Sequence, residues 1–383
     1  MYKAVNDVLR RNPELCTKGA AGVIIGMFFA EGQGHTHWHF TGDKTIDVRL
    51  WKDAAEFLGQ TPGGERQPPL SNNKNEWEKA SHRKVILRNG FSPGDIVTMT
   101  RAVADLAMTY PNWRIDVRSP CPAIWENCPY ITELDETAPD VEVFDIKYDA
   151  INDSGWSGIH FTDAFRLNIE QQLGCKITKT GYKPELWISD MEKSWINQVE
   201  VQFGWKGPFW LLNAGRKPDN ELKQYHRWQE VVDLLNEFFQ GRIKIVQIGH
   251  KDHIHPELNG VLSLVGKTDL RQLIRLAWWA HGTIGPLSLQ FVISAALGQS
   301  HVVVAAGKEG VPWHLYPHGR YIYTNGALNC CAWDGCWLGG KKGRCVDLID
   351  EVPHCMRLIE PYMIADAVKM YYRGGRLGWG RGK

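Results

Sequence analysis

Cysteine residues are concentrated towards the C-terminal end of this chain. Of nine cysteines in 383 residues, five lie between positions 330 and 355. Four of them follow the pattern Cys331-x4-Cys336-x8-Cys345-x9-Cys355, and Cys330 is an alternative ligand. The pattern predicts a structural zinc or iron site, because four thiolates complete a tetrahedral shell and leave no open position for a reacting ligand. A group of free buried thiols is the alternative interpretation.

Three polar loops carry the other side chains that are suited to chemistry. The first, Ser92–Asp95, places a carboxylate at the start of a helix, which plain helix capping would also explain. The second, residues 213–227, holds Arg216 and Lys223 near a helix start, where they suit a phosphate as well as a solvated surface. The third, residues 282–288, is expected to open a helix at a proline, and its free N–H groups would suit a diphosphate.

Two α/β halves are predicted to position these loops. In the first, the apolar strand Lys84–Arg88 precedes a helix with apolar residues at helical spacing, and Asp95 is expected to be its N-cap. In the second, the strand Phe209–Asn213 precedes an amphipathic helix, and His250, His253 and His255 follow a later strand. Such units are typical of an α/β fold with parallel sheets, whose ligands lie at the carboxyl ends of the strands.

Composition and missing motifs exclude several classes of protein. The chain is 43% hydrophobic and 23% charged, and 44 Lys and Arg balance 43 Asp and Glu, which argues against a strongly basic nucleic-acid binder. No apolar stretch approaches the roughly 20 residues that span a bilayer, and no signal peptide is apparent, so a cytoplasmic protein is expected. Walker, dinucleotide-binding, serine-hydrolase and zincin motifs are absent from the sequence.

Five short motifs follow one another in a fixed order along the chain. They are Pro93-Gly94-Asp95-Ile96-Val97-(x)2-Thr100, Tyr110-Pro111-(x)3-Ile115-Asp116-Val117, Lys223-x-Tyr225-x-x-Trp228-x-Glu230-Val231, Leu264-x-Gly266-Lys267-Thr268-x-Leu270 and Gly285-Pro286-(x)9-Ala296-Leu297-Gly298. Their order resembles that of the lipopolysaccharide heptosyltransferase family over about residues 84–370. The cysteine stretch resembles the autotransporter heptosyltransferase branch, which carries a cysteine-bound metal.

The resemblance implies a GT-B fold, in which two Rossmann-like domains face a cleft, and an inverting glycosyltransferase. Such an enzyme moves a sugar, heptose or similar, from a nucleoside diphosphate sugar, often ADP-heptose, to an acceptor hydroxyl on a glycan or protein. The resemblance makes Asp95 the general base and requires no metal for the chemistry. The residues expected to bind the nucleotide sugar are Lys223, Arg216, Thr283, Gly285, Pro286 and Ser288.

The chain departs from the family at one of these motifs. Many relatives have Asp and then Ser or Thr before the Gly-Pro, where this chain has Thr283 and Ile284, and Ser288 replaces a frequent histidine. The motif therefore does not specify which sugar or which nucleotide is used.

The expected organisation has four segments. They are a hairpin-rich appendage (1–80), an acceptor domain (81–205), a nucleotide-sugar domain (206–372) that includes the cysteine-rich segment 330–355, and a flexible tail (373–383). A homo-oligomer is also expected. Two alternatives stay open: a glycosyltransferase acting on hydroxylated bases of DNA, and a non-catalytic module whose metal knuckle and tail bind nucleic acid or protein.

Overall fold

The computed structural model describes residues 82–150, 158–218, 220–331 and 345–373. Residues 79–383 form one compact unit of the chain. The expected appendage (1–80), residues 374–383 of the expected tail and the predicted ligand Cys336 lie outside the described residues. Within the described residues, no helix has both the length and the apolar character needed to cross a membrane.

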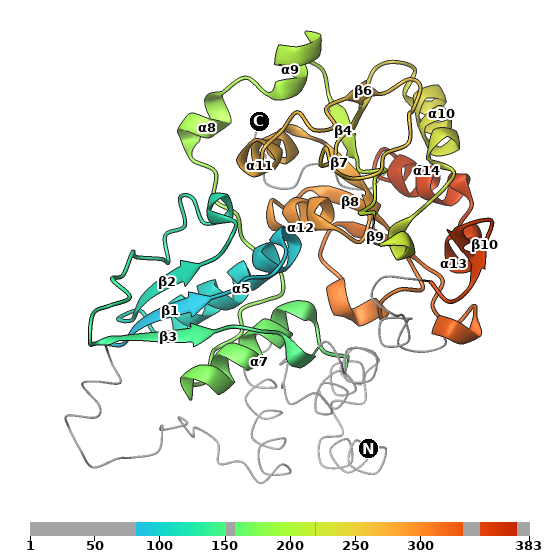
Figure 1. Cartoon of the computed structure of the whole chain (residues 1–383). Coiled ribbons are helices and arrows are strands. Elements are labelled where there is room, and N and C mark those ends of the chain that lie inside the picture. The colour runs from blue at the N-terminus through green and yellow to red at the C-terminus, as the bar shows by residue number, and fades with distance from the viewer. Residues whose placement is uncertain (1–81, 151–157, 219, 332–344, 374–383) are drawn as a thin grey trace, which may run out of the picture. The chain divides into compact units, whose positions relative to one another are not determined.

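A three-stranded parallel sheet in the order β2-β1-β3 forms the N-terminal lobe, residues 82–185 (Figure 1). Its elements are β1 (Lys84–Arg88), α5 (Pro93–Thr109), β2 (Arg114–Arg118), η3 (Pro122–Ile124), β3 (Val141–Asp145) and α7 (Phe161–Leu173). The middle residues of β1 are fully buried, as expected for the central strand of a sheet covered by helices. A connecting segment, residues 186–207, carries α8 (Asp190–Ser194) and α9 (Gln198–Phe203).

Helix α5 begins with a capping box. Ser92 is the N-cap, Pro93 occupies the first helical turn, and Asp95 is the third helical residue, whose carboxylate accepts hydrogen bonds from the backbone and hydroxyl of Ser92. The expectation that Asp95 is itself the N-cap is therefore wrong. A serine followed three residues later by an acidic residue is the usual signature of this motif.

A six-stranded parallel sheet in the order β6-β5-β4-β7-β8-β9 forms the C-terminal lobe, residues 208–373. Its main elements are β4 (Phe209–Leu212), η5 (Glu221–Lys223), α10 (Trp228–Phe239), β5 (Lys244–Gln247), β6 (Leu262–Ser263), α11 (Leu270–Trp279), β7 (Gly282–Pro286), α12 (Leu289–Ala296), β8 (Ser300–Ala306), η6 (Val311–His314), β9 (Gly319–Tyr323) and α14 (Pro361–Lys369). The segment before α14 contains η7 (Asn329–Cys331), β10 (Leu348–Ile349), β11 (Val352–Pro353) and α13 (His354–Arg357). In chain order the six strands run 3-2-1-4-5-6, the Rossmann arrangement.

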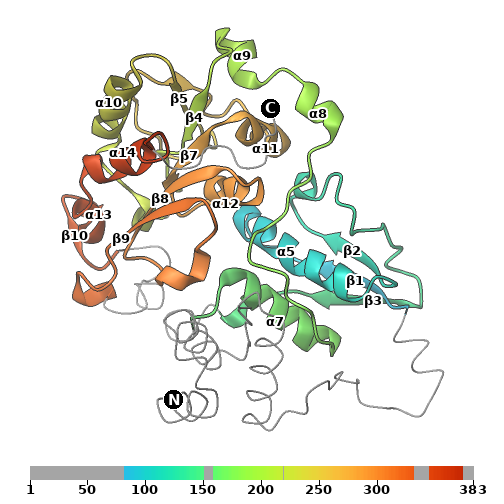
Figure 2. The same cartoon turned by 180° about the vertical axis from the view of Figure 1, so that it is seen from behind.

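Helices cover both faces of this sheet, which explains the unbroken apolar run of β4 (Figures 1 and 2). Alternate residues of a strand point to opposite faces. Trp210 and Leu212 accordingly pack in one core with α10 and α14, whereas Phe209 and Leu211 pack in the other core with α11 and α12. Asp269 caps α11, because its carboxylate accepts a hydrogen bond from the Gln272 backbone N–H.

Residues 282–288 differ from their expected structure. They were expected to be a loop with Pro286 at the first helical position, but Gly282–Pro286 is the buried strand β7, and the following helix begins only at Leu289 after the N-cap Ser288. Glycine is required at the start of this strand, because a Cβ on Gly282 would lie 2.6 Å from the Trp210 ring and from the Ser300 carbonyl oxygen. Packing between β4 and β8 therefore overrides the loop character of Gly and Pro.

The two lobes contact each other mainly through α5 and α12. The two helices approach closely at their N-termini, where a Cβ on Gly94 would lie 3.6 Å from the Leu289 Cα. A further contact joins the hydroxyls of Thr98 and Tyr316, 3.3 Å apart. The helix starts of both lobes therefore lie next to each other.

Candidate functional site

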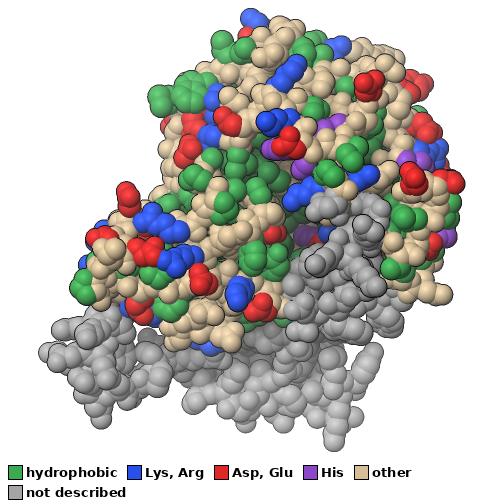
Figure 3. Space-filling view, in the orientation of Figure 1, with side chains coloured by type: hydrophobic (Ala, Val, Ile, Leu, Met, Phe, Trp, Pro, Cys, Tyr) green, Lys and Arg blue, Asp and Glu red, His purple; other side chains and the backbone are tan. Residues whose placement is uncertain are grey.

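A cavity of about 630 Å³ lies between the lobes, where the strands of both sheets end. Loops that follow β1, β4, β5, β7 and β8 all contribute residues to its wall. The cavity lies at the strand pair β4–β7, where the sequence order of the C-terminal sheet reverses, which is where Rossmann folds bind ligands. Figure 3 shows basic, acidic and histidine side chains gathered around the middle of the face that is turned to the viewer.

The structure brings five of the seven predicted catalytic and nucleotide-sugar residues to this cavity. They are Asp95, Arg216, Lys223, Pro286 and Ser288. The other two, Thr283 and Gly285, do not line it. Thr283 is buried, and its hydroxyl contacts that of Ser294 at 3.0 Å, while a Cβ on Gly285 would meet Gln290 and the Asn213 carbonyl oxygen. Thr283 and Gly285 therefore support the wall of the cavity from behind its lining residues.

Asp95 presents a half-buried carboxylate to the cavity. One carboxylate oxygen accepts hydrogen bonds from the Ser92 hydroxyl at 2.8 Å and the Tyr148 hydroxyl at 3.4 Å. Burial raises the pKa of Asp95 above its usual value, the Ser92 hydrogen bonds and Lys223 oppose this rise, and nearby Glu309 adds to it. A carboxylate whose pKa is raised in this way is a better acceptor for a proton from a hydroxyl group.

Lys223 faces Asp95 across the cavity from η5. Burial and the adjacent Lys308 lower the pKa of Lys223 to about 7, although Glu309 and Asp95 favour its charged form. The side chains of Lys223 and Lys308 both line the cavity, close enough that their positive charges disfavour each other. Both amines line one cavity with the start of α12, where they can bind an anion of more than one charge.

Three charged or titratable residues of the cavity were missed by the sequence analysis. Lys308, Glu309 and His314 follow β8, and each is less than 10% exposed. The Glu309 carboxylate is 3.0 Å from the Lys308 ammonium and 2.8 Å from the His314 ring nitrogen. The sequence feature that points to them is a Lys-Glu pair shortly after the apolar strand β8, at the edge of the sheet where ligands bind.

The start of α12 forms one wall of the cavity. Ser288, Leu289 and Gln290 all line it, and the Asn213 amide donates a hydrogen bond to the Ser288 hydroxyl at 3.0 Å. The first N–H groups of any helix lack partners within the helix and carry partial positive charge. This wall can therefore bind phosphate oxygens.

Arg216 and two histidines complete the rim. Arg216 pairs with Ile254 in an isolated β-bridge, and its guanidinium donates to the Lys217 and Pro218 carbonyl oxygens. His250 and His253 line the cavity beside it. Among the described residues, no group of three His, Cys, Asp or Glu side chains is arranged to hold a metal ion.

Of the predicted cysteine ligands, Cys331, Cys345 and Cys355 are described. Burial raises the pKa of Cys355 to about 11, and Cys345, Cys331 and Cys330 contribute to the rise, so the four thiols lie within electrostatic reach of one another. Cys331 and Cys355 pack against Gly307, where an added Cβ would lie 2.7 Å from the Cys331 sulfur. The donor set suits zinc or iron, but a complete metal site is not present among the described residues.

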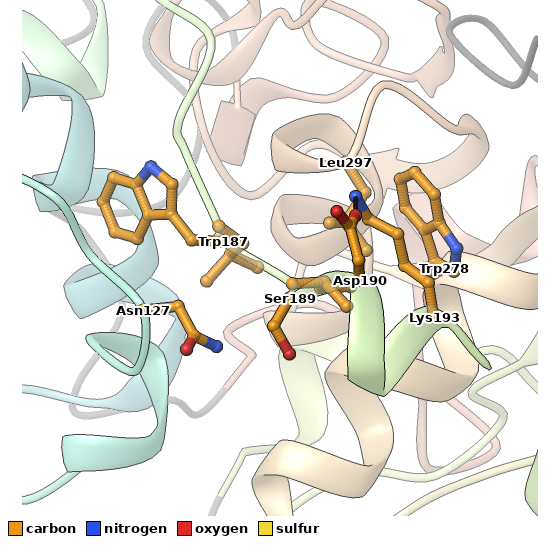
Figure 4. A pocket seen from close by; sticks show the side chains of 9 residues that line it. Asn127, Trp187, Ser189, Asp190, Lys193, Trp278 and Leu297 are labelled. Atoms are coloured by element: carbon orange, nitrogen blue, oxygen red, sulfur yellow. Dashed lines mark hydrogen bonds and ion pairs between the residues drawn. The ribbon is translucent and has the colours of Figure 1, made fainter. Parts of the chain in front are cut away.

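A second, smaller pocket of about 450 Å³ lies beside the connecting segment. Trp187 and Trp278 stand on opposite sides of it, with Ser189 and Asp190 between them, and Asn127 belongs to the N-terminal lobe (Figure 4). None of the predicted site residues lines this pocket.

Arg271 of α11 ties the lobes together next to this pocket. Its guanidinium forms a bidentate ion pair with the Glu192 carboxylate at 2.7 and 2.8 Å. The same guanidinium also donates hydrogen bonds to the carbonyl oxygens of Trp187 and Ala123. The Glu192 side chain is 6% exposed, and Arg271 lowers the pKa of Glu192 to about 2. One side chain thus links the C-terminal lobe, the connecting segment and the N-terminal lobe.

We expect Arg271→Met to lower the free energy of unfolding by about 3 kcal/mol, because it leaves the buried Glu192 carboxylate without a positively charged partner. Glu192 stabilises the wild type above its unfolded-state pKa, and this contribution is lost as the pH falls towards about 2. The variant should lack this acid-dependent loss. Urea unfolding at several pH values measures both effects. Lys193→Met, which removes an exposed pair with Asp190, is the control, and a loss below about 1 kcal/mol for Arg271→Met would contradict the account.

Comparison with solved structures decides the fold. A glycosyl transferase family 9 protein from Veillonella parvula DSM 2008 is 12% identical, with a TM-score of 0.56, and the match covers 75% of this chain and 96% of that one. The dodecameric iron-containing heptosyltransferase TibC, solved with ADP-D-β-D-heptose, is 15% identical, with a TM-score of 0.56, and the match covers 76% of this chain and 77% of that one. The chain has the GT-B fold of these glycosyltransferases.

The same GT-B fold appears in a second TibC structure, from enterotoxigenic E. coli H10407, at 15% identity and a TM-score of 0.55 over 76% of each chain. The family resemblance is thus confirmed for the fold, which is α/β with parallel sheets, as expected. No protein-family model and no curated protein sequence matches the chain.

Proposed function

We propose that this protein is an inverting glycosyltransferase that moves a sugar from a nucleoside diphosphate sugar to an acceptor hydroxyl. The observation that carries the proposal is the cavity at the carboxyl ends of both sheets, in which Asp95 faces Lys223 and the first turn of α12. The likeness to GT-B glycosyltransferases supports this function over that of a non-catalytic binding module.

In the proposed reaction, Asp95 accepts the proton of the acceptor hydroxyl as the oxygen attacks the anomeric carbon. The new carbon–oxygen bond forms on the face opposite the bond to phosphate, so the configuration inverts when that bond breaks. Its electron pair leaves with the nucleoside diphosphate, where negative charge grows. Lys223 and the N–H groups of α12 are placed to stabilise that charge, so no step depends on a metal ion.

The domains divide these tasks in the proposal. Residues 206–372 bind the donor, since Lys223, Ser288 and the histidines at the rim belong to this part of the chain, and residues 81–205 supply Asp95 and face the acceptor. The donor sugar is heptose or a similar sugar carried on ADP, by similarity to TibC with its ADP-heptose ligand. A hydroxyl of a glycan or protein is the proposed acceptor, and a homo-oligomer is the proposed assembly, since TibC is described as dodecameric.

The cysteine segment is proposed to hold a structural metal through Cys331, Cys345 and Cys355 with Cys336. Native mass spectrometry with metal analysis is expected to find one zinc or iron atom per chain, and Cys355→Ser should lose it. A chain without bound metal after anaerobic purification would contradict this part of the proposal.

A direct assay tests the proposed function. The purified protein is incubated with a panel of nucleotide sugars, including ADP-heptose, and mass spectrometry follows release of the nucleoside diphosphate and sugar transfer. We expect release from one donor that depends on Asp95. If no donor in the panel is hydrolysed or transferred and no nucleoside diphosphate raises the melting temperature, the proposed function is wrong.

A further inference from the structure

Lys308 is a buried basic residue that takes part in no step of the proposed reaction. It follows β8 at the wall of the cavity and is 6% exposed, beside the similarly buried Glu309 and His314. Transfer of such charges out of water is costly unless they are paired. Here a single carboxylate, that of Glu309, contacts both the Lys308 ammonium and the His314 ring.

The backbone that presents Lys308 is held in an unusual conformation. Ala306 has a φ of 50°, in the left-handed region that residues with a Cβ rarely adopt, and the pairing of β8 with β9 shifts register at the same place. Gly307 packs so closely on Cys331 that no side chain fits there. Strain of this kind persists where the surrounding structure enforces it, and it is common at ligand sites.

Lys308 faces Lys223, which comes from a different element of the lobe. The groups around Lys223 are the ammonium of Lys308 and the carboxylates of Glu309 and Asp95. Because both lysines line the same cavity, a positive charge on Lys308 disfavours a positive charge on Lys223. The pKa of Lys223 near 7 means that this amine is divided between the neutral and charged forms at neutral pH.

We propose that Lys308 is a second phosphate-binding residue, which together with Lys223 binds the diphosphate of the donor, and that diphosphate binding is coupled to uptake of a proton by this lysine pair. The inference rests on the proposed function, whose donor it describes more closely. A diphosphate between the two amines favours the charged form of both, so Lys223 takes a proton from solvent as the anion binds. Glu309 holds Lys308 in place while the cavity contains no anion.

The proposal predicts a preference for two phosphates over one. A diphosphate reaches both amines, whereas a monophosphate needs only one of them. Loss of one charge-assisted contact typically weakens binding by about tenfold or more. Lys308→Met should therefore weaken binding of ADP by about tenfold or more, and binding of AMP by less than about threefold.

Isothermal titration calorimetry with ADP, AMP and inorganic pyrophosphate tests the proposal. Pyrophosphate makes the result independent of the nucleotide base. Titrations at about pH 7.5 in two buffers of different ionisation enthalpy measure the protons taken up. We expect uptake of a fraction of a proton by the wild type and much less by Lys308→Met, in which Lys223 no longer faces a second ammonium group. Lys308→Arg, which keeps the charge, should restore most of the diphosphate affinity.

The control is Lys251→Met, which removes an exposed lysine of the β5 loop that does not line the cavity. It should bind both nucleotides like the wild type. Circular dichroism and melting temperature show whether each variant folds. The proposed role of Lys308 is wrong if folded Lys308→Met binds ADP and pyrophosphate as tightly as the wild type. It is also wrong if the affinities for ADP and AMP fall by the same factor. If the wild type binds no diphosphate at all, the proposed function itself fails.

Discussion

Asp95→Asn should reduce the rate of sugar transfer by about 10²–10⁴-fold, because an amide cannot accept the proton of the acceptor hydroxyl. The substitution should leave the helix intact, since the amide oxygen of asparagine still accepts the hydrogen bond from the Ser92 backbone in the capping box. Nucleotide affinity should change by less than about threefold, because the phosphate-binding groups belong to the other lobe.

Single-turnover kinetics and nucleotide titration, carried out on the same variant, separate these effects. Asp190→Asn is the matched control, since it removes an exposed carboxylate that lies outside the cavity. An Asp95→Asn enzyme that transfers sugar at a rate close to that of the wild type would show that another group takes the proton.

The second large effect concerns Lys223 and the dependence of kcat/KM on pH. Asp95 must lose its proton to act as a base, and its raised pKa moves the acid limb above the usual range of an aspartate. Lys223 must be charged to stabilise the leaving diphosphate, and its pKa of about 7 places the alkaline limb near neutrality. The profile should therefore be bell-shaped and narrow.

Variants of Lys223 separate charge from position. Lys223→Met should lower kcat/KM by about 10²–10³-fold, the usual cost of one contact to a developing anion. Lys223→Arg keeps its charge at all accessible pH values, so the alkaline limb should move upwards even where the rate is reduced. An alkaline limb that stays in place in Lys223→Arg would assign it to a different group.

Local sequence patterns predicted the strands and helices in which apolar residues recur at the regular spacing of that element. The strand Lys84–Arg88 and the amphipathic helix α10 both agree with expectation. Residues 282–288 did not, because Gly and Pro are typical of loops, and only the packing of Trp210 beside Gly282 shows that a strand runs there. Long-range packing of this kind has no local signature.

The site was predictable to the extent that its residues belong to recognisable motifs. Asp95 and Lys223 come from segments more than 120 residues apart, and the order of motifs was enough to place both at one cavity. Lys308, Glu309 and His314 were not found, because their pairing is visible only after β8 is placed beside β7 at the edge of the cavity.

The most direct test of the account is a crystal structure of the full chain with a nucleoside diphosphate, chosen as the one that most raises the melting temperature. The two phosphates should lie between Lys223 and the first turn of α12, with Asp95 on the far side of the space left for the sugar. Phosphates bound elsewhere on the chain, with this cavity filled only by water, would contradict it.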